Sequence, residues 1–324
     1  MIVLMVSAVL ALLLTLWLIS DKSPLTIMDT PNERSLHEQP TPRSGGVAIL
    51  IAISVTWLIL TFTESWPEAM SWIAVAAALI ATISLLDDLC ELSPLHRILV
   101  HGIAAAILIV GEMILFDGWF GAIFTWFAIV WMLNLYNFMD GMDGFAGGMT
   151  LLGFGFLALG GWLQGGSEYA LYAGVVATAA LGFLGVNFPP ARIFMGDAGS
   201  ATLGLLAAAF SLWGIHDGFF VWWFPLLVFS PFVVDATVTL IRRIMNKERI
   251  WEAHRSHYYQ RLVQLGWGHK KTVLAEYVLM VLAGSSALLL VLLHNSVLTY
   301  AVLLGWVLLY ILLAIQVHRM EAQQ

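Results

Sequence analysis

The chain has 324 residues, of which 60% are hydrophobic and only 11% are charged, and its formal net charge at pH 7 is −7. A soluble domain carries about 25% charged residues, so this composition excludes an ordinary soluble protein and predicts a polytopic membrane protein. The single cysteine, Cys90, excludes an intramolecular disulfide framework and a zinc site built from several cysteines. No base-stacking or groove-reading motif is found, so we expect no nucleic-acid partner.

Long apolar runs follow one another along the chain. A helix needs about 20 apolar residues to cross a hydrocarbon core of about 30 Å. By this measure we expect an all-α fold with about eleven transmembrane helices, in a single integral-membrane domain over residues 1–324, since no polar segment is large enough to fold alone. The runs lie at 2–20, 45–63, 69–86, 97–115, 120–138, 145–163, 169–187, 198–214, 218–241, 272–293 and 296–317. The first lacks the basic start and cleavage site of a signal peptide, and we interpret it as a span.

The basic residues predict the orientation. All 14 Lys and Arg residues lie in, or at helix ends beside, the connections that fall on one side of the membrane, and the loops of the other side contain none. Because an excess of Lys and Arg marks the cytoplasmic side, we expect the N-terminus outside and the C-terminus in the cytoplasm.

Residues 137–144 connect two of the apolar runs and read N-F-M-D-G-M-D-G, which places Asp140 and Asp143 between two spans. A carboxylate at the bilayer centre costs at least about 2.5 to 3.5 kcal/mol, so both must reach water, a metal ion or a cationic partner. The glycines Gly141 and Gly144 allow a sharp turn and close approach of a ligand. The segment therefore predicts the floor of an active site at the membrane surface.

Further polar residues fall on the same predicted side. Asp87 and Asp88 end the third run, and Asp197, in F-M-G-D-A-G-S, opens the eighth as an expected N-cap. Oxygen ligands gathered from several loops suit Mg²⁺ or Mn²⁺, which bind substrate phosphates. The other polar residues on this side are His254 and His257 of H-R-S-H, and the arginines Arg34, Arg43, Arg97 and Arg192.

Each motif also has a structural interpretation. The N-F-M-D-G-M-D-G segment is compatible with an Asp/Gly turn that caps the next helix. An acidic pair at a helix C-terminus is commonly a solvated end, but it opposes the helix dipole at a cost of about 0.3–1 kcal/mol, so Asp87 and Asp88 call for a nearby cation. Asp235, about two turns inside the ninth run, keeps an ion-coupled transporter as an alternative class. A scaffold protein would need no clustered acids.

Five motifs, in this order, resemble those of the polyprenyl-phosphate N-acetylhexosamine-1-phosphate transferases, which are related to the phospho-MurNAc-pentapeptide translocases of peptidoglycan synthesis. They are D-T-P-N-E-R-S-L-H with P-T-P-R-S-G-G (29–46), L-L-D-D-L (85–89), N-F-M-D-G-M-D-G (137–144), N-F-P-P-A-R-I-F-M-G-D-A-G-S (187–200) and H-R-S-H (254–257). The resemblance implies transfer of a sugar 1-phosphate from a UDP-sugar to undecaprenyl phosphate, with release of UMP, in the bacterial cytoplasmic (inner) membrane. The resemblance also implies contact with membrane lipid. We include a homodimer among the expected assemblies.

The resemblance also implies roles for particular residues. Asp197 matches the family's metal-binding Asp and is expected to hold Mg²⁺ at the diphosphate. The expected catalytic residues are Asp87, Asp88, Asp140, Arg97, His254 and His257, with Arg97 near the lipid phosphate. The expected substrate-binding residues are Asn137, Asp143, Asn187, Phe194 and Arg43, of which Asp143 and Asn187 line the uracil pocket and Phe194 stacks on the base.

The last motif departs from the translocases, which carry three successive histidines where this chain has His254 and His257 separated by two residues. This departure argues against a MurNAc-pentapeptide substrate, although a translocase-like enzyme is kept as an alternative. H-R-S-H followed by Y-Y-Q-R-L looks more like the branch that initiates O-antigen synthesis, for which the sugar would be a deoxy-HexNAc such as FucNAc or QuiNAc, or GlcNAc.

Overall fold

The computed structural model describes residues 2–20, 23, 27–29, 40–90, 92–249 and 254–323, and the statements below refer to these residues. Residues 30–37 of the first motif, with Arg34, lie outside them. The helices are α1 (Ile2–Leu18), α2 (Gly45–Leu60), α3 (Glu68–Cys90), α4 (Pro94–Val110), α5 (Gly118–Phe138), α6 (Phe145–Leu163), α7 (Ser167–Asn187), α8 (Asp197–His216), α9 (Trp223–Val228), α10 (Ser230–Met245), α11 (Tyr258–Leu262), the π-helix η1 (Val263–Trp267), α12 (Gly268–Leu293) and α13 (Ser296–Glu321). Two short strands, β1 (Met28–Asp29) and β2 (Thr41–Pro42), pair antiparallel. The expected all-α fold is confirmed.

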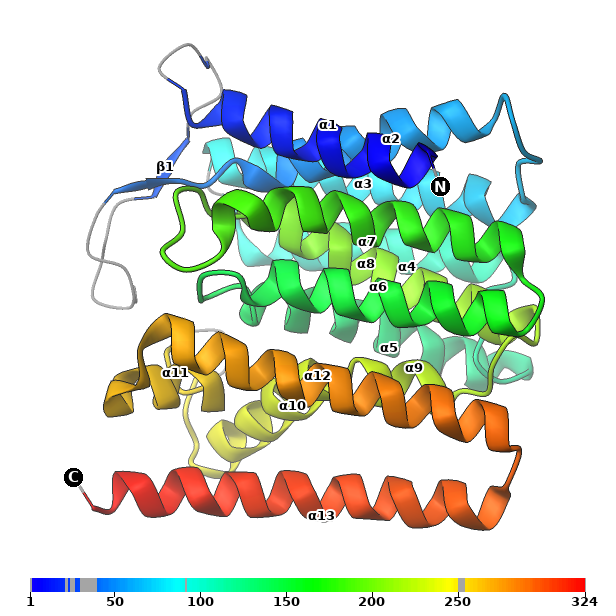
Figure 1. Cartoon of the computed structure of the whole chain (residues 1–324). Helices are drawn as coiled ribbons and strands as arrows, with labels where there is room; N and C mark the ends of the chain where they lie inside the picture. The colour runs from blue at the N-terminus through cyan, green and yellow to red at the C-terminus, as the bar shows by residue number, and fades with distance from the viewer. Residues whose placement is uncertain are drawn as a thin grey trace.

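Helix α8 lies at the centre of the bundle. It packs against α3 and α5, with α2 and α6 also in contact, while α1 packs on α7 and α2, and α12 packs on α6 and α9. Buried residues make up 83% of the most apolar window of α8 but only 11% of that of α13. Figure 1 shows α13 at the edge of the bundle, beyond α12. Helix α13 therefore presents most of its apolar surface outward, as expected for contact with lipid.

Small residues allow the central helices to approach closely. A Cβ on Gly204 of α8 would lie 2.8 Å from the carbonyl oxygen of Met132 in α5, and a Cβ on Gly182 of α7 would lie 2.1 Å from that of Ala8 in α1. In membrane proteins, where water does not drive helices together, such close backbone contact supplies much of the packing energy. The glycines thus explain why α8 and α7 are enclosed by their neighbours.

The ninth expected run, 218–241, is not one helix in the structure. It contains α9 and α10, separated at Phe229, whose φ and ψ are −91° and 5°. Pro231 has no N–H to donate to the carbonyl of Leu227, and the hydroxyl of Ser230 donates to that oxygen instead, at 2.7 Å. The expectation of a continuous span here is therefore wrong, because proline breaks the backbone ladder and the neighbouring serine satisfies the freed carbonyl.

Among the described residues, seven helical segments are long and apolar enough to cross a membrane, and α1, α2 and α4 are shorter apolar helices of 17, 16 and 17 residues. The start of α1 and the C-terminus lie at opposite ends of the bundle (Figure 1). The C-terminus shares its end with β1 and α11, and the end of α3 and the start of α8 lie there too, which places the aspartate motifs together. The protein is a multi-pass membrane protein by length and composition.

Candidate active site

Arg97 connects two of the aspartates. Its Nη1 nitrogen donates to Oδ2 of Asp87 at 2.7 Å and to Oδ2 of Asp197 at 3.2 Å. Asp87 also accepts a hydrogen bond from the backbone N–H of Leu92 at 2.7 Å, through its other oxygen. Because α4 begins at Pro94, only a short turn after α3, Arg97 in its first turn can reach back to the end of α3. Arg97 is therefore the cation that the acidic pair at the C-terminal end of α3 was expected to need.

Asp88 connects α3 to the N-terminus of α8. Its Oδ2 atom accepts from the backbone N–H of Ala198 at 3.1 Å, and Oδ1 lies 3.8 Å from Nε of Arg43. Arg43 also donates to the backbone oxygen of Asp88 at 3.0 Å. The expected N-cap role of Asp197 is wrong, since Gly196 occupies that position with φ +76° and Asp197 is the first helical residue. A carboxylate from α3 serves the N-terminus of α8 instead, and the side chain of Asp197 is directed to Arg97.

Asp140 differs from the other acids of the cluster. No hydrogen bond or ion pair reaches its carboxylate from the described residues, although Asp197 and Asp88 are close enough to act on it electrostatically. Burial, and the negative charges of Asp197 and Asp88, raise the pKa of Asp140 well above its usual range. Asn137, just before it, donates to Oγ of Ser200 in α8 at 3.1 Å. The cluster thus holds an acid that lacks a cationic partner.

The donor set fits a hard divalent cation of the Mg²⁺ type. Within the described ranges no group of three or more His, Cys, Asp or Glu side chains lies close enough to form a complete metal cage. Mg²⁺ commonly keeps several waters and binds through one or two carboxylates together with substrate phosphates. The carboxylates of Asp197 and Asp140 satisfy that lesser requirement, and the carboxylate of Asp140 receives no bond from the described residues that would compete with a cation.

Asp143 and Asn187 form a second group of contacts. Oδ1 of Asp143 lies 3.0 Å from Nδ1 of His269, and its Oδ2 accepts from the backbone N–H of Ala191 at 2.9 Å. Asn187 accepts from the backbone N–H of Gly144 at 2.9 Å and donates to the carbonyl of residue 193 at 2.8 Å. The two side chains therefore fasten the 139–144 turn to the 188–196 loop. Burial acts to raise the pKa of Asp143, but the bonds from His269 and Ala191 outweigh it and lower that pKa.

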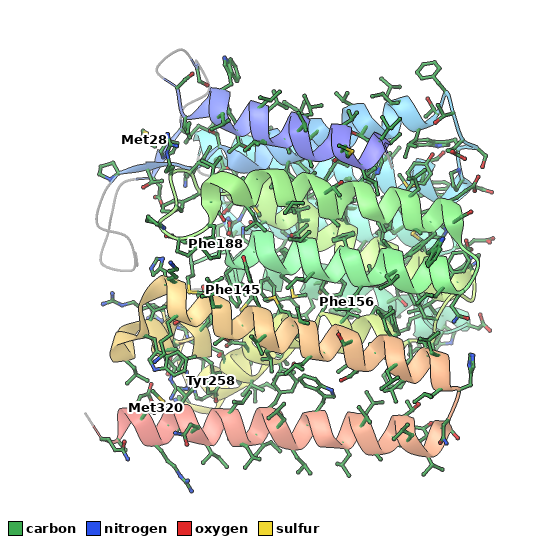
Figure 2. The ribbon with its side chains drawn as sticks, viewed as in Figure 1. Met28, Phe145, Phe156, Phe188, Tyr258 and Met320 are labelled. Atoms are coloured by element: carbon green, nitrogen blue, oxygen red, sulfur yellow. The ribbon has the colours of Figure 1, made fainter. Side chains whose placement is uncertain are left out.

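Sequence reasoning missed His269 and Tyr277, both of α12. The hydroxyl of Tyr277 donates to the carbonyl oxygen of Gly144 at 2.5 Å, and the ring of Phe188 lies beside it with centroids 6.5 Å apart. Figure 2 shows Phe188 at this end of the bundle. A lone histidine after Gly268 and a tyrosine in an apolar helix carry no local pattern, and only the packing of α12 on α6 brings them to the site.

The backbone of Phe194 joins the 188–196 loop to the segment that precedes α2. Its backbone N–H donates to the carbonyl of Pro42 at 2.7 Å, and its carbonyl accepts from Gly45 at 2.9 Å. A Cβ on Gly46 would lie 2.3 Å from Cα of Gly199, so the start of α2 and the start of α8 are in backbone contact. The P-T-P-R-S-G-G and F-M-G-D-A-G-S motifs are therefore one unit in space, and their glycines are required by that contact.

The two histidines of H-R-S-H lie apart from the aspartate cluster. His257 is buried, with Nδ1 at 3.4 Å from Oδ1 of Asp235, and its ring is 4.8 Å from that of His254. Asp235 also accepts from the backbone N–H groups of Tyr258 and Tyr259 at 2.9 and 3.1 Å, so it caps α11. The hydroxyl of Tyr259 then donates to the carbonyl of residue 138 at 3.2 Å. The ring of His257 also stacks on that of Phe138, with centroids 6.4 Å apart, so the histidines reach the 137–144 segment both directly and through α11.

The fold and the cluster define a multi-pass membrane protein whose acidic and arginine side chains, from five separate segments, meet at one end of the bundle. The profile of glycosyl transferase family 4 matches residues 70–215. The chain is 34% identical over 280 residues to a probable undecaprenyl-phosphate N-acetylglucosaminyl 1-phosphate transferase of Bacillus subtilis, which covers 81% of this chain and 77% of the relative.

Two further relatives are similar over most of their length. A decaprenyl-phosphate N-acetylglucosaminephosphotransferase of Mycolicibacterium smegmatis is 32% identical over 76% of this chain and 71% of its own. A phospho-N-acetylmuramoyl-pentapeptide-transferase of Listeria monocytogenes is 29% identical over 74% and 81%. The chain therefore belongs to glycosyl transferase family 4, and the resemblance drawn from its motifs is confirmed.

Proposed function

We propose that the protein transfers an N-acetylhexosamine 1-phosphate from a UDP-sugar to undecaprenyl phosphate and releases UMP. The observation that carries the proposal is the cluster of Asp87, Asp88, Asp140 and Asp197 at one end of a membrane bundle, in which Arg97 bridges Asp87 and Asp197. Two polyprenyl-phosphate N-acetylglucosamine transferases among the relatives support it. A lipid phosphate can enter this end laterally from the membrane, while a nucleotide sugar arrives from water.

The reaction needs positioning more than a base. The lipid phosphate has a second pKa of about 6, so its oxygen is already an anion at pH 7. That oxygen attacks the phosphorus that bears the sugar, a new diphosphate bond forms, and the bond to the UMP phosphate breaks. No proton has to be removed from the acceptor. Two anions must instead be brought together, which favours catalysis by charge neutralisation.

Different side chains of the described residues neutralise the charge of each substrate. Arg97, shared by Asp87 and Asp197, is the cation placed to meet the acceptor phosphate, and Arg43 is held beside Asp88. A Mg²⁺ ion held by Asp197 and Asp140 would supply positive charge to the diphosphate and to the leaving UMP. Asp143 and Asn187 hold the loop that carries Phe194, the aromatic proposed to stack on uracil.

The finer assignment is also a proposal. The site would face the cytoplasm of a bacterial cytoplasmic membrane, and the product would prime an O-antigen or another surface glycan. GlcNAc in the names of two relatives supports GlcNAc as the sugar, beside the deoxy sugars FucNAc and QuiNAc. The Listeria relative keeps a translocase-type substrate as the second candidate. Transport is disfavoured, since the carboxylate of Asp235 caps α11.

The test is turnover by the purified protein. UMP release should require undecaprenyl phosphate, a divalent cation and UDP-GlcNAc or a related UDP-HexNAc together. UDP-MurNAc-pentapeptide should be a poor donor. If UMP is released with UDP-MurNAc-pentapeptide as donor but not with any UDP-HexNAc, the substrate of the translocases replaces the proposed one. UMP release in the absence of lipid phosphate would refute transfer.

A further inference from the structure

A polar cavity lies between α10, α11 and α13, at the same end of the bundle as the aspartate cluster but separate from it. Its volume is about 510 Å³, and among the described residues of its lining Leu265 is the one apolar side chain. The side chains that matter for charge are Arg242, Arg255, Arg261, His318, Glu248 and Glu321. Figure 2 shows Tyr258 and Met320 where α11 and the end of α13 come together.

The two acids of this lining are already paired. Glu248 accepts from Nε of Arg243 at 2.8 Å, and Glu321 accepts from both Nε and Nη2 of Arg261. Arg242 donates to the carbonyl of Ser256 at 2.6 Å, and no acid among the described residues pairs with Arg242 or Arg255. The cavity therefore keeps an excess of positive charge.

One guanidinium nitrogen of Arg261, a residue that lines the cavity, lacks an acceptor. Arg261 is only 7% exposed, and its Nη1 atom is buried with no hydrogen-bond partner among the described residues. Leaving a buried charged donor unpaired is costly. Arg261 and Arg242 also lie over the same ring, with their Cζ atoms 4.7 and 5.5 Å from the centroid of Tyr258. Glu321 already pairs with Arg261, so Arg242 is the cation of these two whose charge remains for an anionic ligand.

An apolar groove continues from the cavity. Its volume is about 410 Å³, and it follows one face of α13, where it is lined by Ile311, Ala314, Ile315, His318 and Arg319 of that helix and by Ala322 just after its end. His318 lines both the groove and the polar cavity. A ligand that fits both spaces has an anionic head and a hydrocarbon tail.

We propose that the cavity and groove bind one anionic glycerophospholipid, with its phosphate among Arg242, Arg255 and Arg261 and an acyl chain along α13. Basic pockets between helices at the membrane surface recognise lipid head groups in this way. The lipid would join α10 and α11 to the loosely packed α13, and through α11 it would support the turn that carries Asp140. This inference concerns a site separate from the proposed transfer reaction.

The experiment uses the full chain in neutral detergent with added phosphatidylglycerol or phosphatidylcholine, and native mass spectrometry counts the retained lipids. Wild type should retain one phosphatidylglycerol in preference to phosphatidylcholine. Arg242→Gln and Arg255→Gln should each weaken retention roughly fivefold, as expected for one basic residue near a membrane surface. The double variant should weaken retention by the product of the two single factors. Lys270→Gln removes one charge at the same end without touching the cavity, and it should retain the lipid like wild type.

Two further measurements distinguish a lipid head group from free inorganic phosphate as the ligand of the cavity. Ala314→Trp fills the groove, so it should weaken retention of phosphatidylglycerol, and inorganic phosphate should not displace the lipid. If the Arg255→Gln and Lys270→Gln proteins, both folded by thermal melt, retain equal amounts of lipid, the proposal is overturned. It is overturned equally if inorganic phosphate displaces the lipid and Ala314→Trp has no effect, or if a second copy of the chain occupies this face and excludes the lipid.

Discussion

The Nη1 nitrogen of Arg97 lies 3.2 Å from Oδ2 of Asp197, which joins the first turn of α4 to the first residue of α8. The same nitrogen donates to Asp87 at 2.7 Å. One cation thus serves two carboxylates, and each carboxylate receives only part of its charge. A substrate phosphate that displaces either contact would gain an arginine that is already held in position.

Arg97→Gln should therefore lower UMP release by roughly a hundredfold, the scale for loss of one preorganised charge donor. The apparent KM for undecaprenyl phosphate should rise more than that for the UDP-sugar. Lys247→Gln is the control, because Lys247 is an exposed basic residue after α10, outside the proposed substrate site, and its loss should leave both constants within about twofold. Equal effects of the two variants would remove Arg97 from the acceptor site.

Asp197→Asn keeps the size of the side chain and removes the charge proposed to hold Mg²⁺. Turnover should be nearly abolished, and Mg²⁺, which should raise the Tm of the wild-type protein, should not raise that of the variant. Asp235→Asn should lower the Tm by weakening the cap of α11, yet it should keep the stabilisation by Mg²⁺. If Asp197→Asn responds to Mg²⁺ as wild type does, the ligand assignment is wrong.

The contacts of Asp143 predict a pH dependence of stability. Its folded pKa is lowered by His269 and Ala191, so its ionised form stabilises the fold at pH values above the unfolded pKa of about 3.9. This contribution is lost as the pH falls through the folded pKa. Asp143→Asn should lower the unfolding free energy by about 1 kcal/mol at pH 7, and thermal melts should show the difference from wild type shrinking below about pH 4. A difference that is constant down to pH 3 would contradict this.

Much of the fold follows from the sequence because apolar length and turn residues are local properties. The runs from 2–20 to 296–317 all contain helices, and the single failure, 218–241, came from treating Ser230 and Pro231 as part of an apolar run. The motifs also indicated which acids gather at one end. The partners could not be predicted in the same way, since Arg97 with Asp197 and His269 with Asp143 depend on how α4, α8 and α12 pack. Such pairs cannot be predicted from local sequence patterns, because their members are far apart in the chain.

The basic residues predict that the aspartate end faces the cytoplasm. Cys90, the single cysteine, is exposed at the end of α3 on that side, so an impermeant thiol reagent should not label it in intact cells but should label it in lysed cells. A Cys90→Ser protein with Ser167→Cys, exposed at the start of α7, should show the opposite accessibility. Labelling of Cys90 from outside would reverse the orientation and place the site on the wrong face.

Isotope exchange tests the central claim, phosphosugar transfer to a lipid phosphate, most directly. Because one diphosphate linkage replaces another, the reaction should be readily reversible, whereas hydrolysis would run essentially to completion. Purified protein with UDP-sugar, Mg²⁺ and undecaprenyl phosphate should incorporate labelled UMP into UDP-sugar, and only after lipid-linked product has formed. Consumption of UDP-sugar without lipid phosphate, or failure of excess UMP to drive the reaction backward, would contradict transfer and indicate a membrane-bound pyrophosphatase that uses the same aspartates.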